Sequence, residues 1–336
     1  GADPGMDGGD PMSRYARQIA VPGFGAAAQE RLGRATALVV GAGGLAAPVL
    51  QYLAGAGVGR LRIVDPDRVE ESNLHRQTLF RHADIGHPKA EAAARTLGDL
   101  NPETVAEPVV AALHPGNVDV LVDGADVVLD CADSFAVSYI LSDTCLRAGL
   151  ALVSASVIGT EGYAGTFCDG APSLRAVFPE LPPRLGSCAE DGVLGPVVGV
   201  VGAVQAQMAL TLLAGLEPTP RGRIVSYDGL AQRFGGFSFL GAEEVSGPGF
   251  IHLSEIRNND FTVDLRAEHE GEIVRSDARR LTVADFVDGA PLPEAGQRAV
   301  LCCRSGQRAW SAAERLATLW PGEIVLVALG DHKEQP

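Results

Sequence analysis

Four side chains in the stretch from Ser72 to Ala94 could hold phosphate groups: Asn73, Arg76, Gln77 and Lys89. A triphosphate that is cleaved between its first two phosphates develops negative charge, and fixed cations stabilise that charge. Removing one such donor typically costs about 10²–10³ in rate. A bound diphosphate cofactor needs little beyond the N-terminus of a helix. The cations therefore favour a site that cleaves a nucleoside triphosphate.

A glycine-rich turn precedes these cations, in the stretch "VVGAGGLAA". Gly41 and Gly43 begin the pattern G-x-G-x-x-G/A between an expected strand and an expected helix, and Gly44 belongs to the same turn. Backbone N–H groups at such a helix N-terminus bind phosphate, and an acid that ends the next strand binds ribose hydroxyls. Asp65 has that position, and Asp67 follows it. The pattern predicts a nucleotide without identifying it, and an NAD-dependent oxidoreductase would also carry it.

Two acids in "LDCADS", Asp130 and Asp133, follow another expected strand. In open α/β sheets, ligands bind at this edge of the sheet. A carboxylate beside a triphosphate acts as a magnesium ligand, because hard cations prefer oxygen ligands. We expect Asp133 to bind magnesium with ATP, with Ser134 beside it in the nucleotide site. Asp130 could equally well cap a turn.

The second feature that could do chemistry is a thiol, in the stretch "LCCRSGQR". Cys303 ends an apolar strand and precedes two arginines and a helix. Backbone N–H groups at a helix N-terminus and nearby cations favour the thiolate. We therefore expect Cys303 to be a nucleophile or persulfide carrier, and Cys302 to point to the opposite face of the strand. Cys188 lies in a polar loop and could be a second functional thiol or an ordinary free one.

The elements that must position these residues alternate between strands and helices, which predicts a parallel sheet. We expect strands over 36–40, 61–64, 105–110, 126–130, 151–157 and 223–228, and helices over 45–56, 89–100 and 134–148. The segment 234–250 is rich in glycine and is interpreted as a linker. After it, strands over 261–266, 299–303 and 323–329 and a helix over 311–319 predict a small second α/β unit.

These elements predict an α/β fold with a Rossmann-like, mostly parallel sheet, followed by a small α/β domain. We place a disordered lead at 1–12, the nucleotide-binding domain at 13–240, a linker at 241–250 and the second domain at 251–336. The charge-free segment 193–216 is long enough to span a membrane. Its glycines, its proline and its polar flanks favour a buried helix that could also form a dimer interface.

The composition excludes some functional classes. The chain has 336 residues, and its formal net charge of -15 argues against a nucleic-acid partner. Six cysteines without the spacing of a disulfide framework, and the absence of a signal peptide, predict a reducing cytoplasm. No membrane association is expected.

Several separated stretches resemble the ubiquitin-activating-enzyme-like adenylyltransferases of bacteria, the ThiF/MoeB/HesA family, which activate sulfur carriers for molybdopterin and thiamine synthesis. The stretches are "RYARQIAVPGFG", "VVGAGGLAAPVLQYLAGAGVGRLRIVDPDRVEESNLHRQTLF", "DIGHPKAEAA", "LNP", "LDCADS", "GVLGPVVGVVGAVQA" and "YDGLAQRF", and they extend over about 13–234. The resemblance implies a reaction in which ATP and the C-terminal glycine of a ubiquitin-like carrier form an acyl-adenylate and pyrophosphate.

The same resemblance implies roles for individual residues. Gly41 lies in the nucleotide turn, and Asp65 binds ribose. Asn73, Arg76 and Lys89 hold phosphates, and Asp133 binds magnesium. The resemblance also implies a homodimer, in which Arg17 reaches into the partner subunit's site. Cys188 corresponds to a cysteine in a crossover loop that can form a covalent link to the carrier.

The chain departs from the family pattern at some positions. Ala46 replaces a glycine, which the G/A pattern tolerates, and Ala132 and Ser134 flank Asp133 where the family has threonine and asparagine. The family often binds zinc with two C-x-x-C pairs, but the corresponding stretch "PSLRAVFPE" has no cysteine. A closed zinc site needs four ligands, so no zinc is predicted.

"LCCRSGQR" and "VDLRAEHE" resemble the active loop and the preceding strand of a rhodanese sulfurtransferase. This resemblance implies that a Cys303 persulfide, charged by a cysteine desulfurase or another sulfur donor, supplies sulfur for a carrier thiocarboxylate. The domain is abbreviated, because the usual G-H-I-P-G-A segment is not recognisable between Glu272 and Phe286. Its activity therefore stays open.

Other functions remain possible at this stage. One is a related adenylating enzyme that acts on another acceptor and has an inactive rhodanese domain. Another is an NAD-dependent oxidoreductase, which would leave Arg76, Lys89 and the Cys303 loop unexplained. The sequence does not distinguish carriers for molybdopterin, thiamine, cysteine, tRNA thiolation or a secondary metabolite.

Overall fold

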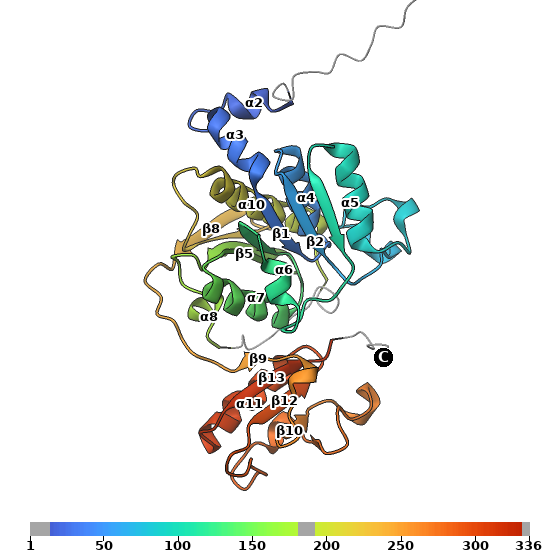
Figure 1. Ribbon diagram of the computed structural model, residues 1–336, viewed down its shortest axis with the longest axis vertical. Coiled ribbons are helices and arrows are strands. Elements are labelled where there is room, and N and C mark those ends of the chain that lie inside the picture. Colours follow the sequence, from blue (N-terminus) through green and yellow to red (C-terminus); the bar gives the residue numbers. More distant parts are fainter. Residues whose placement is uncertain (1–13, 181–191, 331–336) are drawn as a thin grey trace, which may run out of the picture.

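The computed structural model describes residues 14–180 and 192–330 and contains two sheets (Figure 1). The first has eight strands in the order β3-β2-β1-β4-β5-β6-β7-β8. Their bounds are Thr36–Val40 (β1), Arg60–Val64 (β2), Val105–Val109 (β3), Val127–Asp130 (β4), Ala151–Ile158 (β5), Glu161–Phe167 (β6), Arg223–Asp228 (β7) and Arg233–Ser238 (β8). The strands from β3 to β5 pair in parallel, and β6, β7 and β8 are antiparallel. The predicted mostly parallel α/β sheet is confirmed.

Helices cover both faces of the first sheet. One face packs against α3 (Gly25–Arg34), α4 (Ala46–Gly55), α5 (Lys89–Leu100) and α10 (Gly195–Ala214). The other carries α6 (Val118–Val122), α7 (Phe135–Ala148) and α8 (Leu174–Val177). A short helix, α2 (Ala16–Ile19), precedes α3. The β1–β2 and β4–β5 strands are buried on both faces, as expected of parallel strands covered by helices.

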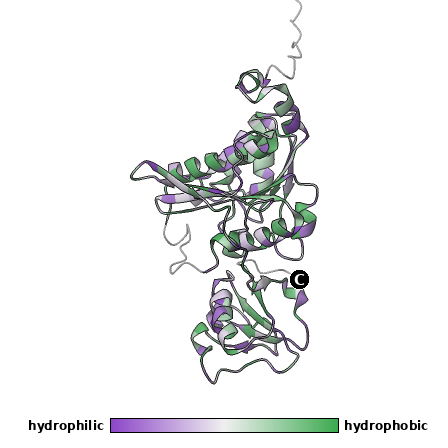
Figure 2. Cartoon of the chain, turned by 90° about the vertical axis from the view of Figure 1, so that its left-hand side faces the viewer, coloured by the Kyte–Doolittle hydropathy of each residue, from purple (hydrophilic) through white to green (hydrophobic). Residues whose placement is uncertain are grey.

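The second sheet has five parallel strands in the order β11-β10-β12-β13-β9. Their bounds are Gly249–Phe250 (β9), Phe261–Asp264 (β10), Arg279–Arg280 (β11), Ala299–Cys303 (β12) and Ile324–Ala328 (β13). Helix α11 (Gln307–Leu319) packs on β12 and β13. Single-turn 3₁₀ helices lie at 71–73, 82–84, 253–255, 268–270 and 283–285. Figure 2 shows hydrophobic segments along the strands of both sheets and along the helices that cover them.

The glycine-rich segment that the composition indicates as a linker is partly a strand. Residues 233–238 form β8, the edge strand of the first sheet, and all six are exposed. A Cβ on Gly236 would lie 2.2 Å from the carbonyl oxygen of Ile224 on β7. The glycine therefore permits the close approach of two strand backbones, a role that composition alone does not distinguish from a linker.

Helix α10 is the charge-free segment, and by length and apolar composition it is the one helix among the described residues that could cross a membrane. In the fold it packs against α3 and α4 and across β4, β5, β6 and β7. A Cβ on Gly202 would lie 2.6 Å from the carbonyl oxygen of Leu45, so this glycine lets α10 approach the start of α4. The prediction of a core helix agrees with this packing.

Candidate active site

A cavity of about 1170 Å³ opens at the carboxyl ends of β1, β2, β4 and β5. Strand order reverses between β1 and β4, and ligands of open α/β sheets bind at such a reversal. The cavity wall contains all of the cofactor-binding residues predicted from the sequence: Gly41, Gly43, Gly44, Asp65, Asp67, Asn73, Arg76, Gln77, Lys89, Asp133 and Ser134. The topology therefore brings these separated stretches to one place.

The glycine turn forms the floor of the cavity between β1 and α4. Gly41 has a φ of 91°, and a Cβ there would lie 2.7 Å from the carbonyl oxygen of Cys131. A side chain is excluded by both conformation and space. At Gly44, a Cβ would lie 2.7 Å from a methyl carbon of Val198. The turn thus presents bare backbone at the N-terminus of α4, the arrangement that binds phosphate.

Asp65 is buried at the end of β2 and holds the glycine turn in place. Its Oδ2 accepts a hydrogen bond from the backbone N–H of Ala42 at 2.7 Å, and its Oδ1 accepts one from Asp67 at 2.8 Å. Burial raises the pKa of this carboxyl, while the charge of Lys89 and the two backbone donors act in the opposite direction. The side chain also reaches the cavity wall, where it can meet a nucleotide.

The two predicted cations have different environments. Lys89 begins α5, and its buried Nζ lies 3.0 Å from Oδ2 of Asp67. Arg76 is partly exposed, and its Nη1 donates to the backbone carbonyl of Ser72 at 3.3 Å and contacts Nε2 of His75 at 2.8 Å. One cation is fixed by an ion pair, whereas the other contacts a backbone carbonyl and a histidine ring and is not paired with a described carboxylate.

Two amide side chains, Asn73 and Gln77, also line the cavity. Asn73 ends a 3₁₀ turn and accepts a hydrogen bond from the backbone N–H of Glu70 at 3.1 Å. Gln77 is 4% exposed, and its Oε1 is buried without a hydrogen-bond partner among the described residues. The Gln77 amide lies 3.5 Å from the position that a Cβ on Gly43 would take. An unsatisfied amide beside a phosphate-binding turn is a polar group that a ligand can satisfy.

The two acids after β4 have separate environments. Asp133 is exposed on the cavity wall and makes no hydrogen bond or ion pair with a described residue. Asp130 is fully buried and accepts hydrogen bonds from the Ser138 hydroxyl at 2.6 Å and the Ser154 hydroxyl at 2.8 Å. Burial raises the pKa of Asp130 to about 6, against the effect of its hydrogen bonds. Asp130 is not part of the cavity wall, which fits the alternative of a structural acid.

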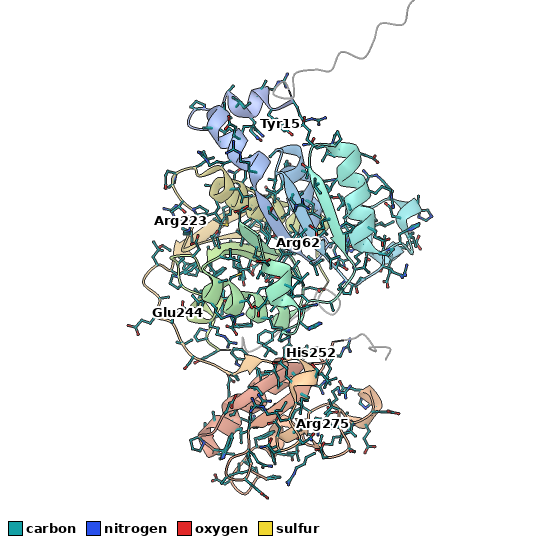
Figure 3. The ribbon with its side chains drawn as sticks, viewed as in Figure 1. Tyr15, Arg62, Arg223, Glu244, His252 and Arg275 are labelled. Carbon is teal, nitrogen blue, oxygen red and sulfur yellow. The ribbon has the colours of Figure 1, made fainter. Side chains whose placement is uncertain are left out.

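The predicted site residue Arg17 has a different position. Arg17 is exposed on α2 and is absent from the cavity wall of its own chain. Tyr15, its neighbour two residues earlier, marks this end of the molecule in Figure 3. Cys188 lies outside the described residues. Across 14–180 and 192–330, no three His, Cys, Asp or Glu side chains gather closely enough to hold a metal ion by themselves.

Cys303 ends β12, where its sulfur accepts hydrogen bonds from the backbone N–H groups of Gly306 at 3.2 Å and Ala309 at 3.3 Å. These donors and the charge of Arg308 lower the pKa of the thiol, as the sequence predicts. Burial raises it by more, so the pKa of Cys303 lies above its ordinary value. The expectation of a thiolate is wrong for this arrangement, because the side chain is fully buried. Cys302 packs in a separate cluster on the opposite face of the sheet.

The aromatic part of the cavity wall is not among the site residues predicted from the sequence. Phe135 and Tyr139 of α7 and Tyr163 of β6 line it, and so does Gln307, the first residue of α11. Phe135 and Tyr139 are four residues apart in a helix that begins after an N-cap serine. This spacing places both side chains on one face of the helix. The contribution of Gln307 depends on how the second sheet lies against the first, and no local pattern encodes it.

Comparison with known proteins agrees with the fold and the site. The profile of the ThiF family matches residues 15–244. The adenylyltransferase and sulfurtransferase UBA4 of Yarrowia lipolytica is 47% identical over 207 residues, which cover 60% of this chain and 52% of the relative. The SAMP-activating enzyme E1 of Haloferax volcanii is 43% identical over 66% of this chain and 83% of the relative. The bovine (Bos taurus) adenylyltransferase and sulfurtransferase MOCS3 is 46% identical over 66% of this chain and 50% of the relative.

The chain spans about half the length of the UBA4 and MOCS3 relatives that it matches. Among solved structures, Escherichia coli MccB with ATP aligns with a TM-score of 0.59 at 21% identity, covering 67% of this chain and 71% of MccB. MccB with MccA-N7isoASN aligns with a TM-score of 0.61 at 21% identity, covering 67% and 72%. These likenesses show a shared fold. Because the family profile covers most of the chain, including the entire cavity wall apart from Gln307, the chain belongs to the ThiF family.

Proposed function

We propose that this chain uses ATP to adenylate the C-terminal glycine of a ubiquitin-like sulfur carrier, and that a Cys303 persulfide then supplies sulfur for the carrier thiocarboxylate. The observation that carries the proposal is the meeting of the bare glycine turn, Lys89, Arg76 and Asp133 on one cavity wall. This set can hold a triphosphate and stabilise a departing pyrophosphate. The names of the adenylyltransferase and sulfurtransferase relatives support it.

In the proposed site, backbone N–H groups after Gly41 hold phosphate, and Asp65 and Asp67 lie where ribose hydroxyls can be bound. Asn73, Gln77, Arg76 and Lys89 surround the phosphates. Asp133 fits a magnesium ion shared with ATP, because its carboxylate is exposed on the cavity wall and has no hydrogen bond to a described residue. Magnesium would neutralise phosphate charge there. The chain's own residues would position the ATP α-phosphorus beside the carrier's C-terminus.

The adenylation step is a displacement at the α-phosphorus. A carboxylate oxygen of the carrier's terminal glycine forms a bond to that phosphorus, the bond to the bridging oxygen breaks, and pyrophosphate leaves with its electron pair. Arg76 and Lys89 stabilise the charge that develops on pyrophosphate. The product is a carrier acyl-adenylate, which is an activated acyl donor.

The sulfur step uses the terminal sulfur of a Cys303 persulfide as the nucleophile. It forms a bond to the acyl carbon, and AMP leaves, which gives an acyl disulfide between the carrier and Cys303. A second thiol, from Cys188 or from a small-molecule reductant, attacks the Cys303 sulfur. The carrier leaves as a thiocarboxylate, and Cys303 is left in a disulfide with that thiol. A further thiol reduces this disulfide before a cysteine desulfurase or another donor recharges the cysteine.

We propose that the chain divides as its sequence predicts, with an adenylyltransferase domain at 13–240, a linker at 241–250 and a rhodanese-like domain at 251–336. The first sheet lies within the first range, and the second sheet begins at Gly249 within the linker. A homodimer would allow the exposed Arg17 to reach the partner subunit's cavity. Persulfide chemistry needs a reducing compartment, so we place the protein in the cytoplasm.

ATP–pyrophosphate exchange tests the adenylation step. The expected result is exchange that depends on a purified ubiquitin-like carrier ending in Gly-Gly and that vanishes when the carrier's last glycine is removed. Exchange with a different acyl acceptor and none with the carrier would favour the related adenylating enzyme. Oxidation of NADH coupled to a substrate, without exchange, would favour the oxidoreductase.

A Cys303→Ser variant tests the sulfur step. It should still catalyse carrier-dependent exchange and should yield no thiocarboxylate when the carrier is analysed by mass spectrometry after incubation with a cysteine desulfurase and cysteine. The matched Cys302→Ser variant should retain thiocarboxylation, because Cys302 faces the opposite cluster. Unchanged thiocarboxylation by the Cys303 variant would move the sulfur role elsewhere, first to Cys188.

A further inference from the structure

The two sheets are connected through an aromatic contact that centres on Trp310. Trp310 belongs to α11 and is 3% exposed. Its ring centroid lies 5.4 Å from that of Phe135 and 4.8 Å from that of Tyr139, both on α7. The Phe135 ring meets it edge-on, at 81°. A helix of the second unit therefore inserts its largest side chain against a helix of the first.

The guanidinium of Arg175 stacks on two of the rings in this contact. Its guanidinium carbon lies 4.9 Å from the Trp310 ring centroid and 5.2 Å from that of Tyr139. The same guanidinium forms a two-pronged ion pair with Asp143, with distances of 2.6 and 2.8 Å, and donates to the carbonyl of Pro248 at 3.1 Å. A buried arginine that is paired and stacked is oriented rigidly. It links α8, α7 and the segment that enters the second sheet.

A second contact joins the two units. The ring of His252, labelled in Figure 3, stacks on the ring of His114 with centroids 4.3 Å apart. His114 follows β3 of the first sheet, and His252 follows β9 of the second. The two units thus meet through the ring contacts around Phe135 and Trp310 and through the His114–His252 pair.

The contact places the start of α11 at the nucleotide cavity. Gly306 caps the helix with a φ of 87°, and a Cβ there would lie 2.7 Å from the Phe250 ring and 3.3 Å from Cβ of Ala136. The positive φ and the Phe250 ring both favour glycine here, at a point where α11 approaches α7. The next residue, Gln307, lines the cavity together with Phe135. The first turn of α11 therefore forms part of the cavity wall.

The same turn holds the sulfur. Cys303 Sγ accepts hydrogen bonds from Gly306, which precedes α11, and from Ala309, the neighbour of Trp310. Trp310 and the sulfur-binding turn thus belong to the same end of α11, and a displacement of this helix end away from α7 moves both. In the docked arrangement Cys303 has no solvent exposure. A donor protein cannot form a bond to a sulfur atom that it cannot reach.

We propose that Trp310 is a positioning residue that latches the sulfur-binding turn against the nucleotide cavity, and that the latch opens when Cys303 receives sulfur from a donor. The latch consists of Trp310, Phe135, Tyr139 and Arg175. The closed state keeps the thiol from solvent and holds the turn that binds it against the cavity wall, which Gln307 lines. The open state exposes it. This inference rests on the proposed function, and its first two tests do not require that function.

The first test reads the latch directly by fluorescence. The chain has two tryptophans, Trp310 and Trp320. In a Trp320→Phe protein, the emission of Trp310 should be blue-shifted and protected from acrylamide quenching. Adding Arg175→Met should shift the emission to the red and increase quenching, because the side chain that orients Trp310 from the first unit is removed. If acrylamide fully quenches Trp310 in the Trp320→Phe protein that retains Arg175, the tryptophan is exposed to solvent and the docked arrangement is refuted.

The second test reads access to the thiol. Iodoacetamide labelling of Cys303, followed by peptide mass spectrometry that separates it from Cys302, should be about tenfold or more faster in Trp310→Ala than in wild type, because the aromatic packing that favours the closed state is removed. Arg175→Met leaves the second unit's own sequence intact and should accelerate labelling as well. The matched control is Trp320→Ala, at the far end of α11. Equal labelling rates in the control and both latch variants would refute the proposal.

The third test separates positioning from the two partial reactions. Trp310→Ala should keep carrier-dependent ATP–pyrophosphate exchange at the wild-type level and lose about tenfold or more in carrier thiocarboxylation, because the sulfur turn is no longer held at the cavity. Thiocarboxylation at the wild-type rate would overturn the positioning role. A wild-type protein without exchange would refute the proposed function, while the quenching and labelling results would still decide whether the latch exists.

Discussion

Nζ of Lys89 and Oδ2 of Asp67 lie 3.0 Å apart at the edge of the nucleotide cavity, with the lysine buried and the aspartate exposed. The pair joins the start of α5 to the loop after β2, two stretches that are separated by 22 positions in the chain. A nucleotide phosphate that enters the cavity meets a cation already fixed in position. Preorganised charge of this kind contributes most to stabilising a transition state, because it needs no reorganisation during the reaction.

Replacing Lys89 with Met should therefore lower the rate of carrier-dependent ATP–pyrophosphate exchange by about 10²–10³. The matched control is Arg95→Met, which removes a cation from the same helix that pairs with Asp84 and does not line the cavity. The control should keep the wild-type exchange rate. If both variants lose exchange equally, the effect comes from α5 as a whole, and the role of Lys89 in catalysis is contradicted.

Gln77 provides a test in which stability and binding change in opposite directions. Its Oε1 is buried without a described partner, an arrangement that costs about 1–3 kcal/mol in the free protein. Gln77→Leu should therefore keep or raise the free energy of unfolding, measured by urea denaturation. The amide nitrogen is the Gln77 atom nearest to Gly43 of the glycine turn, where it can donate to a phosphate oxygen, so the same variant should bind ATP roughly tenfold or more weakly in calorimetry.

Two outcomes would count against a ligand-binding role for Gln77. One is a large loss of stability, which would mean that the amide already has a structural partner. The other is unchanged ATP affinity. Gln29, a buried glutamine whose amide donates to the backbone carbonyl of Ala56, offers the contrast. Gln29→Leu should lose stability and leave ATP affinity unchanged in the same calorimetric measurement.

Glu270 controls the charge beside Cys303. Arg308 donates to Oε2 of Glu270 at 2.8 Å, and this pairing holds the pKa of Glu270 at about 2. The Arg308 charge is one of the effects that lower the pKa of the Cys303 thiol. In Glu270→Gln the guanidinium charge is no longer compensated, so the pKa of Cys303 should fall and the pH profile of its alkylation should move to lower pH. Glu268→Gln, in the same 3₁₀ turn, should leave the profile unchanged.

Several short strands that lie between turn residues could be predicted from the sequence. The segments 36–40, 223–228 and 299–303 match β1, β7 and β12 residue for residue. The glycine turn could also be located, because a strand and a helix flank it and its backbone conformation requires glycine. In each case the information is local. The carboxyl ends of parallel strands then converge by topology, which is why Lys89, Arg76 and Asp133 could be assigned to one site.

What could not be predicted depends on contacts between distant segments. β8 was missed because its glycines serve the approach of β7 rather than flexibility. The pKa of Cys303 was predicted in the wrong direction because its complete burial could not be inferred from its neighbours in the chain. Trp310 carries no signal in the sequence that distinguishes an interdomain contact from an ordinary core position. Its partners on α7 and α8 precede it by more than a hundred residues.

Asp130 gives a prediction about stability and pH. Burial raises its pKa in the folded protein to about 6, above the ordinary value of 3.8, so the folded state binds a proton more tightly than the unfolded state. The stabilisation from this group is complete below about pH 4 and is lost as pH rises toward 6. Asp130→Asn removes this titration. The hydroxyls of Ser138 and Ser154 can rotate to accept hydrogen bonds from the new amide, so the variant should fold.

The measurement is the free energy of unfolding in urea for wild type and Asp130→Asn at several values between about pH 4 and 7.5. Other acids contribute equally to both proteins, so the difference isolates Asp130. As pH rises through this range, the free energy of unfolding of the variant should rise relative to that of wild type. The difference between the two proteins should become constant above about pH 7. Ser154→Ala removes a hydrogen bond that favours the charged form of Asp130, which raises the pKa of that carboxyl further. The pH-dependent loss of stability in the Ser154→Ala protein should therefore occur at higher pH. A difference between wild type and Asp130→Asn that is independent of pH would mean that Asp130 stays charged in the fold, held by the same two hydroxyls that surround it.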